Sequence, residues 1–146
     1  MSNYPSSQVR RDLDNHSEAR HNDDSANPPV PPKQEDVSRI LRARRARNTF
    51  FDAELFADPA WDMLLELYAA ELGQHKISVS SLCVGSNVPA TTALRWIQTL
   101  EKQHLLKRVA DPLDGRRVFV SLTVKGSRAM TAYFQALKSR PRSQVC

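Results

Sequence analysis

The 146-residue sequence predicts a mainly α-helical fold with one small β-hairpin. Apolar residues recur at helical spacing in three stretches: residues 36–51, 58–73 and 90–104. A strand, a turn-rich tip and a second strand follow the third stretch, and another helix begins near residue 124. A short helix and a turn also precede residues 90–104, and this order of elements is that of a winged helix-turn-helix domain.

The composition divides the chain into three parts. Residues 1–35 hold few large apolar side chains, so we expect a disordered arm that ends in a proline-rich linker. That linker is either a stiff spacer or a ligand for a proline-binding module. We expect one domain over residues 36–140 and a flexible tail over 141–146.

The formal charge is +5 for the whole chain and is unevenly distributed. Residues 1–35 carry four Lys or Arg against six Asp or Glu, a net −2, and the remainder carries seventeen against ten, a net +7. A small basic domain attracts polyanions, of which nucleic acid is the common one.

Catalytic and metal-binding patterns are missing from the sequence. It contains no glycine-rich phosphate loop, no nucleophile elbow and no paired-histidine helix, so we expect neither an enzyme nor a cofactor or metal site. Cys83 and Cys146 form no disulfide framework. No apolar signal segment or membrane span is present in the sequence, and we expect a cytoplasmic protein.

Residues 36–51 carry Val37, Ile40 and Leu41 at helical spacing. Five arginines form a cationic face on this helix: Arg39, Arg42, Arg44, Arg45 and Arg47. This face either binds phosphates or is the solvated face of a dimerisation helix. We expect Phe50 and Phe51 to anchor the end of this helix in the core.

Residues 58–73 carry the clearest helix signals. Asp58 is a good N-cap, Pro59 suits the first helical position, and Gly73 is a plausible stop. Apolar side chains lie on two sides of this helix, which predicts burial on both: Trp61, Leu64, Leu65, Tyr68 and Leu72 on one, Met63, Leu67 and Ala70 on the other.

A helix-turn-helix pattern follows a short strand at Lys76 and Ile77. Ser78 caps a short helix over 79–85, and a second helix runs from Pro89 to about His104. We expect its core face to hold Ala93, Trp96, Ile97 and Leu100. Its other side presents side chains that suit phosphates and base edges: Ala90, Thr91, Thr92, Arg95, Gln98 and Thr99. The alternative is an ordinary solvated helix face, which has a similar composition.

The predicted hairpin has strands over 107–110 and 118–122, joined by a tip rich in turn residues. Asp114 is close enough in sequence to hold the Arg116 guanidinium outward, where a narrow A·T-rich minor groove would accept it. The alternative is a surface ion pair on a turn. With Ser78 at the helix cap and Arg117 beside the tip, these residues complete the predicted DNA-binding set.

Residues 55–135 resemble the MarR family of bacterial transcription regulators. The residues that carry the resemblance are Leu100-Glu101, Leu105-Leu106, Asp111-Pro112, Asp114, Arg116, Val120 to Thr123 and Gly126. The resemblance implies that Arg116 enters the minor groove, that helix 90–104 reads the major groove and that Thr123 caps the next helix. Duplex DNA is then the partner, and any small-molecule effector is left open.

Relatives in that family usually dimerise through helices at both termini. Here no long helix follows the one over residues 124–138. We therefore expect a homodimer through helices 36–51 and 124–138, to which Met130, Tyr133, Phe134 and Leu137 contribute. Two other functions stay open: a winged helix that binds another regulator through Trp96, the arginine-rich helix and the arm, and general RNA or nucleoid binding.

Overall fold

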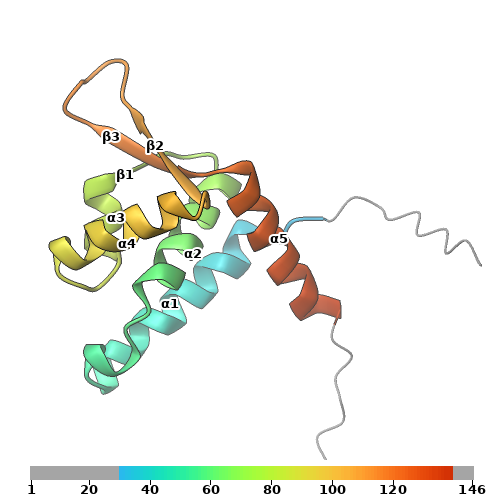
Figure 1. Cartoon of the computed structure of the whole chain (residues 1–146). Coiled ribbons are helices and arrows are strands. Elements are labelled where there is room, and N and C mark those ends of the chain that lie inside the picture. Colours follow the sequence, from blue (N-terminus) through green and yellow to red (C-terminus); the bar gives the residue numbers. More distant parts are fainter. Residues whose placement is uncertain (1–29, 140–146) are drawn as a thin grey trace, which may run out of the picture.

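The computed structural model describes residues 30–139 and contains five α-helices, one 3-10 helix and three strands in that range (Figure 1). In chain order these are α1 (Gln34–Phe50), η1 (Ala53–Phe56), α2 (Pro59–Leu72), β1 (Ile77–Ser78), α3 (Val79–Gly85), α4 (Ala90–Lys102), β2 (Leu106–Ala110), β3 (Val118–Leu122) and α5 (Val124–Ser139). The predicted fold class is confirmed, and the element bounds agree with the sequence to within about two residues. The arm before residue 30 and the tail at 141–146 lie outside the described residues.

The three strands form one antiparallel sheet in the order β1-β3-β2. Val120 of the central strand pairs with Ile77 on one side and Arg108 on the other. Leu106, Val120 and Leu122 are buried, so one face of the sheet closes the core. Toward its tip the β2–β3 hairpin extends beyond the helices, on the side of the molecule where α3 and α4 lie (Figure 1).

Helix α2 lies at the centre of the core and contacts α1, α3, α4, α5 and β3. Its predicted burial on two sides is confirmed, since Met63, Leu65, Leu67 and Tyr68 are all buried. The Tyr68 hydroxyl lies 2.8 Å from Oγ1 of Thr131 in α5. No helix in the described range has both the length and the apolar character that a membrane crossing requires.

The predicted helix caps are also present. The Asp58 carboxylate accepts a hydrogen bond from the Trp61 amide at the start of α2, and the Ser78 hydroxyl accepts one from the Ser81 amide at the start of α3. Such caps satisfy amide donors that the first helical turn leaves without partners. The two helix starts were therefore predictable from single side chains.

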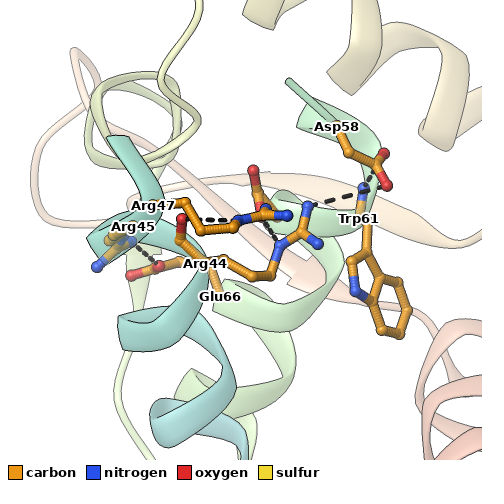
Figure 2. Close-up of polar contacts among 7 residues, drawn as sticks. Arg44, Arg45, Arg47, Asp58, Trp61 and Glu66 are labelled. Carbon is orange, nitrogen blue, oxygen red and sulfur yellow. Dashed lines mark hydrogen bonds and ion pairs between the residues drawn. The ribbon is translucent and has the colours of Figure 1, made fainter. Parts of the chain in front are cut away.

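Helix α1 docks on α2 through ion pairs as well as apolar contacts. Its buried side chains are Val37 and Leu41. The Arg44 guanidinium binds the Asp62 carboxylate, and Arg45 binds Glu66 (Figure 2). The guanidinium groups at these two positions are thus not free for phosphates, because they pair with acidic groups of α2, although Arg45 remains exposed.

Two predictions about aromatic side chains at the end of α1 were wrong. Phe50 is 78% exposed and Phe51 is 56% exposed, so neither anchors α1 in the core. The helix ends at Phe50 and the chain turns into η1, where the Phe51 ring meets the edge of the Phe56 ring at 5.6 Å between centroids.

Two further residue assignments changed in the structure. Trp96 is 38% exposed, because Ala93, Ile97 and Leu100 already form the core face of α4 and Trp96 lies on its flank. Met130 and Phe134 are buried in the chain's own core. Of the four α5 residues assigned to a dimer interface, only Tyr133 and Leu137 present exposed side chains.

The end of α4, the start of β2 and the start of α5 are joined by closely spaced backbone contacts. The Thr123 amide donates to the Leu105 carbonyl at 3.0 Å, and the Thr123 hydroxyl donates to the His104 carbonyl. The same hydroxyl oxygen accepts from the Gly126 amide at 3.0 Å, which confirms Thr123 as the cap of α5. A Cβ atom on Gly126 would lie 2.0 Å from the Leu105 carbonyl oxygen, so only glycine fits there.

We expect Gly126→Ala to lower the free energy of unfolding by about 1–3 kcal/mol or more, because the added methyl group forces α5 away from a backbone carbonyl. Gly115→Ala in the hairpin tip is the matched control, since a Cβ there has no neighbour within 4 Å. Urea unfolding followed by circular dichroism measures both. Equal midpoints for the two variants would contradict the close approach.

Arg44→Met should lower the free energy of unfolding by about 1–3 kcal/mol, because it leaves a half-buried carboxylate without its partner. The side chains of Arg44 and Asp62 are each 19% exposed. The control is Arg39→Met, since Arg39 is 73% exposed and its pair with Asp36 spans 3.7 Å; there we expect a change within about 0.5 kcal/mol. The same urea titration compares them, and a similar loss in both variants would argue against ion-pair docking of α1.

Candidate nucleic-acid interface

The outward surface of α4 carries the predicted reading residues. Ala90, Thr91, Arg95, Gln98 and Thr99 are exposed, and Thr92 is half-buried. None of them belongs to the buried face of the helix, which is formed by Ala93, Ile97 and Leu100. The structure therefore leaves these side chains accessible on one helix.

The residues outside that face form two stripes. Leu94, Gln98 and Glu101 follow the spacing i, i+4, i+7, and Thr92, Trp96 and Thr99 follow the same spacing on the other flank. The second stripe lines a shallow depression of about 340 Å³ together with Arg95. Arg95 lies between the stripes, at the part of α4 most distant from the core.

A larger hollow, of about 580 Å³, separates the hairpin from the start of α3. It brings together four predicted site residues, namely Ser78, Asp114, Arg116 and Arg117. The reading residues of α4 do not line this hollow. The predicted site is thus a surface with two parts, one on α4 and one between the hairpin tip and the start of α3.

The hairpin tip is fixed by bonds to its backbone. The Asp111 carboxylate accepts from the Leu113 amide at 2.9 Å, and the Asp114 carboxylate accepts from the Arg116 amide at 3.0 Å. The Arg117 amide donates to the Asp114 carbonyl at 3.0 Å. Asx bonds of this kind hold a turn in one conformation.

The role predicted for Asp114 needs correction. Within residues 30–139 no ion pair joins its carboxylate to the Arg116 guanidinium, and the carboxylate binds the backbone amide instead. A two-residue separation lets an aspartate reach the nearer amide, and that bond leaves the guanidinium exposed. Asp114 therefore shapes the turn that carries Arg116 rather than aiming its side chain.

Arg108 is a functional candidate that the sequence analysis missed. It lines the hollow beside Arg116 and Arg117, and its guanidinium binds the Glu101 carboxylate of α4 at 2.6 and 3.1 Å. These charge-assisted hydrogen bonds lower the pKa of Glu101 and raise that of Arg108. Strand alternation from buried Leu106 would have placed Arg108 on the inner face of the hairpin.

The Glu101–Arg108 pair also orients α4 relative to the hairpin. Because Glu101 belongs to the stripe with Leu94 and Gln98, that stripe is the flank of α4 nearer to the hairpin. The stripe with Thr92 and Thr99 lies on the far flank. The pair thus shows that the flank of α4 with Gln98 is the one that faces the arginine-bearing hairpin.

No group of three or more metal-ligating side chains occurs in the part of the chain that the structure describes. Cys83 is buried as a free thiol, and burial raises its pKa. Such burial disfavours the reactive thiolate form of its sulfur.

Comparison with known proteins identifies the domain. Residues 67–126 match the family model described as a winged helix DNA-binding domain. No curated protein matches the chain in sequence. This match agrees with the winged helix fold of the structure.

Solved structures agree with this fold. The MepR–DNA complex of S. aureus aligns with 72% of this chain and 84% of its own, at 20% identity and a TM-score of 0.50. A mutant of S. aureus MepR aligns with 77% and 84%, at 21% identity and a TM-score of 0.50. A mutant of E. coli MarR aligns with 72% and 70%, at 19% identity and a TM-score of 0.47. The family model and the MepR alignments with a TM-score of 0.50 confirm the winged helix fold, with which the resemblance to MarR-family regulators is consistent.

The Glu101–Arg108 pair makes a small, pH-dependent contribution to stability. Because the pKa of Glu101 is lowered in the folded chain, this contribution is present above the carboxyl's usual pKa and is lost as pH falls through the lowered one. We expect Glu101→Gln to be less stable than the parent at pH 7, by under about 1 kcal/mol for so exposed a pair. The difference in stability should narrow when the pH is lowered from 7 to 3, as measured by urea unfolding at both pH values. If the difference in free energy of unfolding were the same at both pH values, the Glu101–Arg108 pair would not be its source.

Proposed function

We propose that the chain is a transcription regulator that binds duplex DNA sequence-specifically in the cytoplasm, with α4 in the major groove and the hairpin in the minor groove. One observation carries the proposal: an arginine-lined hairpin and a helix with exposed polar side chains are tied together by the Glu101–Arg108 pair. The match to the winged helix DNA-binding model supports the same conclusion.

On α4, we assign base contacts to the flank that faces the hairpin and to the part of the helix most distant from the core. Arg95 has the reach and the donors for a guanine edge, and Gln98 can pair with adenine. Thr91 and Ala90, in the first turn, are small enough to let the backbone approach a base edge or a thymine methyl. Thr92 and Thr99 lie on the far flank, where their hydroxyls would bond phosphates.

On the hairpin, we assign Arg116 to the minor groove. Its guanidinium is exposed on a turn whose backbone is fixed, so little order remains to be imposed on the backbone when DNA binds. A narrow A·T-rich groove has a strong negative potential that attracts such a side chain. Arg117 and Ser78 border the same hollow and are assigned to phosphates, whereas Arg108 stays paired with Glu101.

We further propose a homodimer. Helices α1 and α5 lie at the two ends of the described chain, and Tyr133 and Leu137 give α5 an exposed apolar stripe. A two-fold dimer would bind a pseudo-palindrome with half-sites about 10 bp apart. The test is to select bound duplexes from a random pool at moderate salt. The selected sequences would give the operator, and a palindrome among them would show two-fold symmetry. Recovery of no common sequence would contradict sequence-specific binding.

A second candidate function is contact with another protein. Four apolar side chains of the α1–η1 corner are exposed, which is unusual for a surface without a partner: Phe50, Phe51, Leu55 and Phe56. A winged helix that works only through such a surface would have no duplex affinity. The salt dependence of duplex binding separates the two functions.

Arg116→Ala should weaken duplex binding by at least about 1 kcal/mol, because it removes a cation from the minor groove. The slope of log K against log salt should fall by about 0.9 if that cation also neutralises a phosphate. Fluorescence anisotropy with a selected duplex measures both. Leu113→Ala is the matched control, since Leu113 is 95% exposed in the same tip. Equal affinity of the Arg116 variant and the parent would reject the minor-groove assignment.

A further inference from the structure

The hollow of about 580 Å³ between the hairpin and the start of α3 has a cationic lining. Arg108, Arg116 and Arg117 contribute guanidinium groups to it, and all three residues are exposed. Asp114 is the acidic residue of the lining, and its carboxylate already accepts the Arg116 amide. Within residues 30–139, Arg116 and Arg117 form no ion pair. The hollow therefore holds positive charge that this part of the chain does not neutralise.

A segment of the opposite charge precedes residue 30. Residues 12–24, which we call the acidic segment, contain one basic residue, Arg20, against five acidic ones, a net −4: Asp12, Asp14, Glu18, Asp23 and Asp24. The formal charge of the whole chain is +5, so this segment is an exception in it. Carboxylates bind guanidinium groups through short, charge-assisted hydrogen bonds. The segment thus has the chemistry that the hollow lacks.

The start of α1 lies close to the hollow. The Gln34 side chain packs against Gly73 at the end of α2. Ser78 borders the hollow and follows Gly73 by five residues, so the two lie at most about 18 Å apart. Pro32 is buried and Lys33 has an extended backbone, with φ −73° and ψ 148°. The chain therefore enters α1 from a defined place, within about 25 Å of the hollow.

The acidic segment can reach this far. Its residues precede Gln34 by 10 to 22 positions. A coil of that length has a root-mean-square end-to-end distance of about 17–28 Å, and prolines such as those at 28, 29, 31 and 32 make a chain longer still. A tethered segment of matching reach has an effective concentration of about 1 mM at its site. Even weak ion pairs are populated under that condition.

We propose that the acidic segment lies on the arginine-lined hollow when no DNA is bound. Its carboxylates pair with the guanidinium groups of Arg116 and Arg117, and the phosphates of a duplex displace them. Arg44 and Arg45 of α1 are unsuitable partners, because carboxylates of α2 already bind them. The competition with DNA rests on the proposed function, whereas the contact itself is a property of the free chain. Salt weakens the contact, since exposed charges are screened.

The contact is tested in the full chain without DNA. A nitroxide attached at Ser17→Cys, in a Cys146→Ser background, marks the middle of the acidic segment, and the remaining Cys83 is buried. Broadening of the amide signals of the ¹⁵N-labelled chain reports which surface the nitroxide approaches. We expect broadening concentrated at residues 78–80 and 114–118, and its loss in about 0.5 M salt. Broadening that is concentrated on another surface, spread evenly or absent would overturn the proposal.

Two matched variants separate the effect of charge from that of chain length. The amide variant removes all five carboxylates, and the acid variant keeps five by exchanging each Asp for Glu and Glu18 for Asp. The amide variant carries Asp12→Asn, Asp14→Asn, Glu18→Gln, Asp23→Asn and Asp24→Asn. We expect the amide variant to lose the broadening at the hollow and the acid variant to keep it. Equal broadening in the two variants would contradict a contact through ion pairs.

Duplex binding then measures the consequence for DNA. At low salt the amide variant should bind the random pool of duplexes about two- to tenfold more tightly than the parent, because no bound segment has to be displaced. The acid variant should bind like the parent, and the difference should narrow as salt is added. Equal affinities of the amide variant and the parent at low salt would overturn the competition. If neither binds a duplex while the broadening at the hollow is present, the contact is supported and the proposed function fails.

Discussion

The contact between Gly126 and the Leu105 carbonyl fixes where the hairpin leaves the domain. Three backbone segments meet there: the end of α4, the first residue of β2 and the first turn of α5. Thr123 binds two successive carbonyls, those of His104 and Leu105, and caps α5 with the same hydroxyl. Because β3 runs directly into Thr123, any shift of α5 would move β3, and with it the arginines at the tip.

This junction gives a physical reason for the residues that carry the family resemblance. Glu101 holds Arg108, Leu106 and Leu122 bury the base of the hairpin, and Thr123 and Gly126 allow α5 to approach closely. None of these contacts needs DNA. They set the position of the hairpin relative to α4 before any ligand is bound, as the proposed binding of two grooves would require.

The sequence predicted elements better than it predicted side-chain partners. Caps and stops are local, so Asp58, Ser78 and Gly73 marked helix ends correctly. Trp96 and Phe50 were misplaced because periodicity shows that a side chain lies near an apolar stripe, not whether the core has room for it. The contacts of Arg44 with Asp62 and of Arg108 with Glu101 join separate elements, and no single-sequence pattern specifies such pairs. The tip bond of Asp114 was missed for the opposite reason, since a nearer backbone amide outcompeted the guanidinium.

Net charge overstates the number of cations that can meet a phosphate. Arg44 and Arg45 are paired with α2, and Arg108 is paired with Glu101. Among the described residues, Arg95, Arg116 and Arg117 form no ion pair and lie on the proposed DNA surface. In the proposed complex, the phosphate contacts would therefore be fewer than the net charge alone suggests. Sequence-specific binding as proposed would then depend on base contacts and, in the proposed dimer, on a doubled surface, so that the arrangement of α4 and hairpin would matter more than total charge.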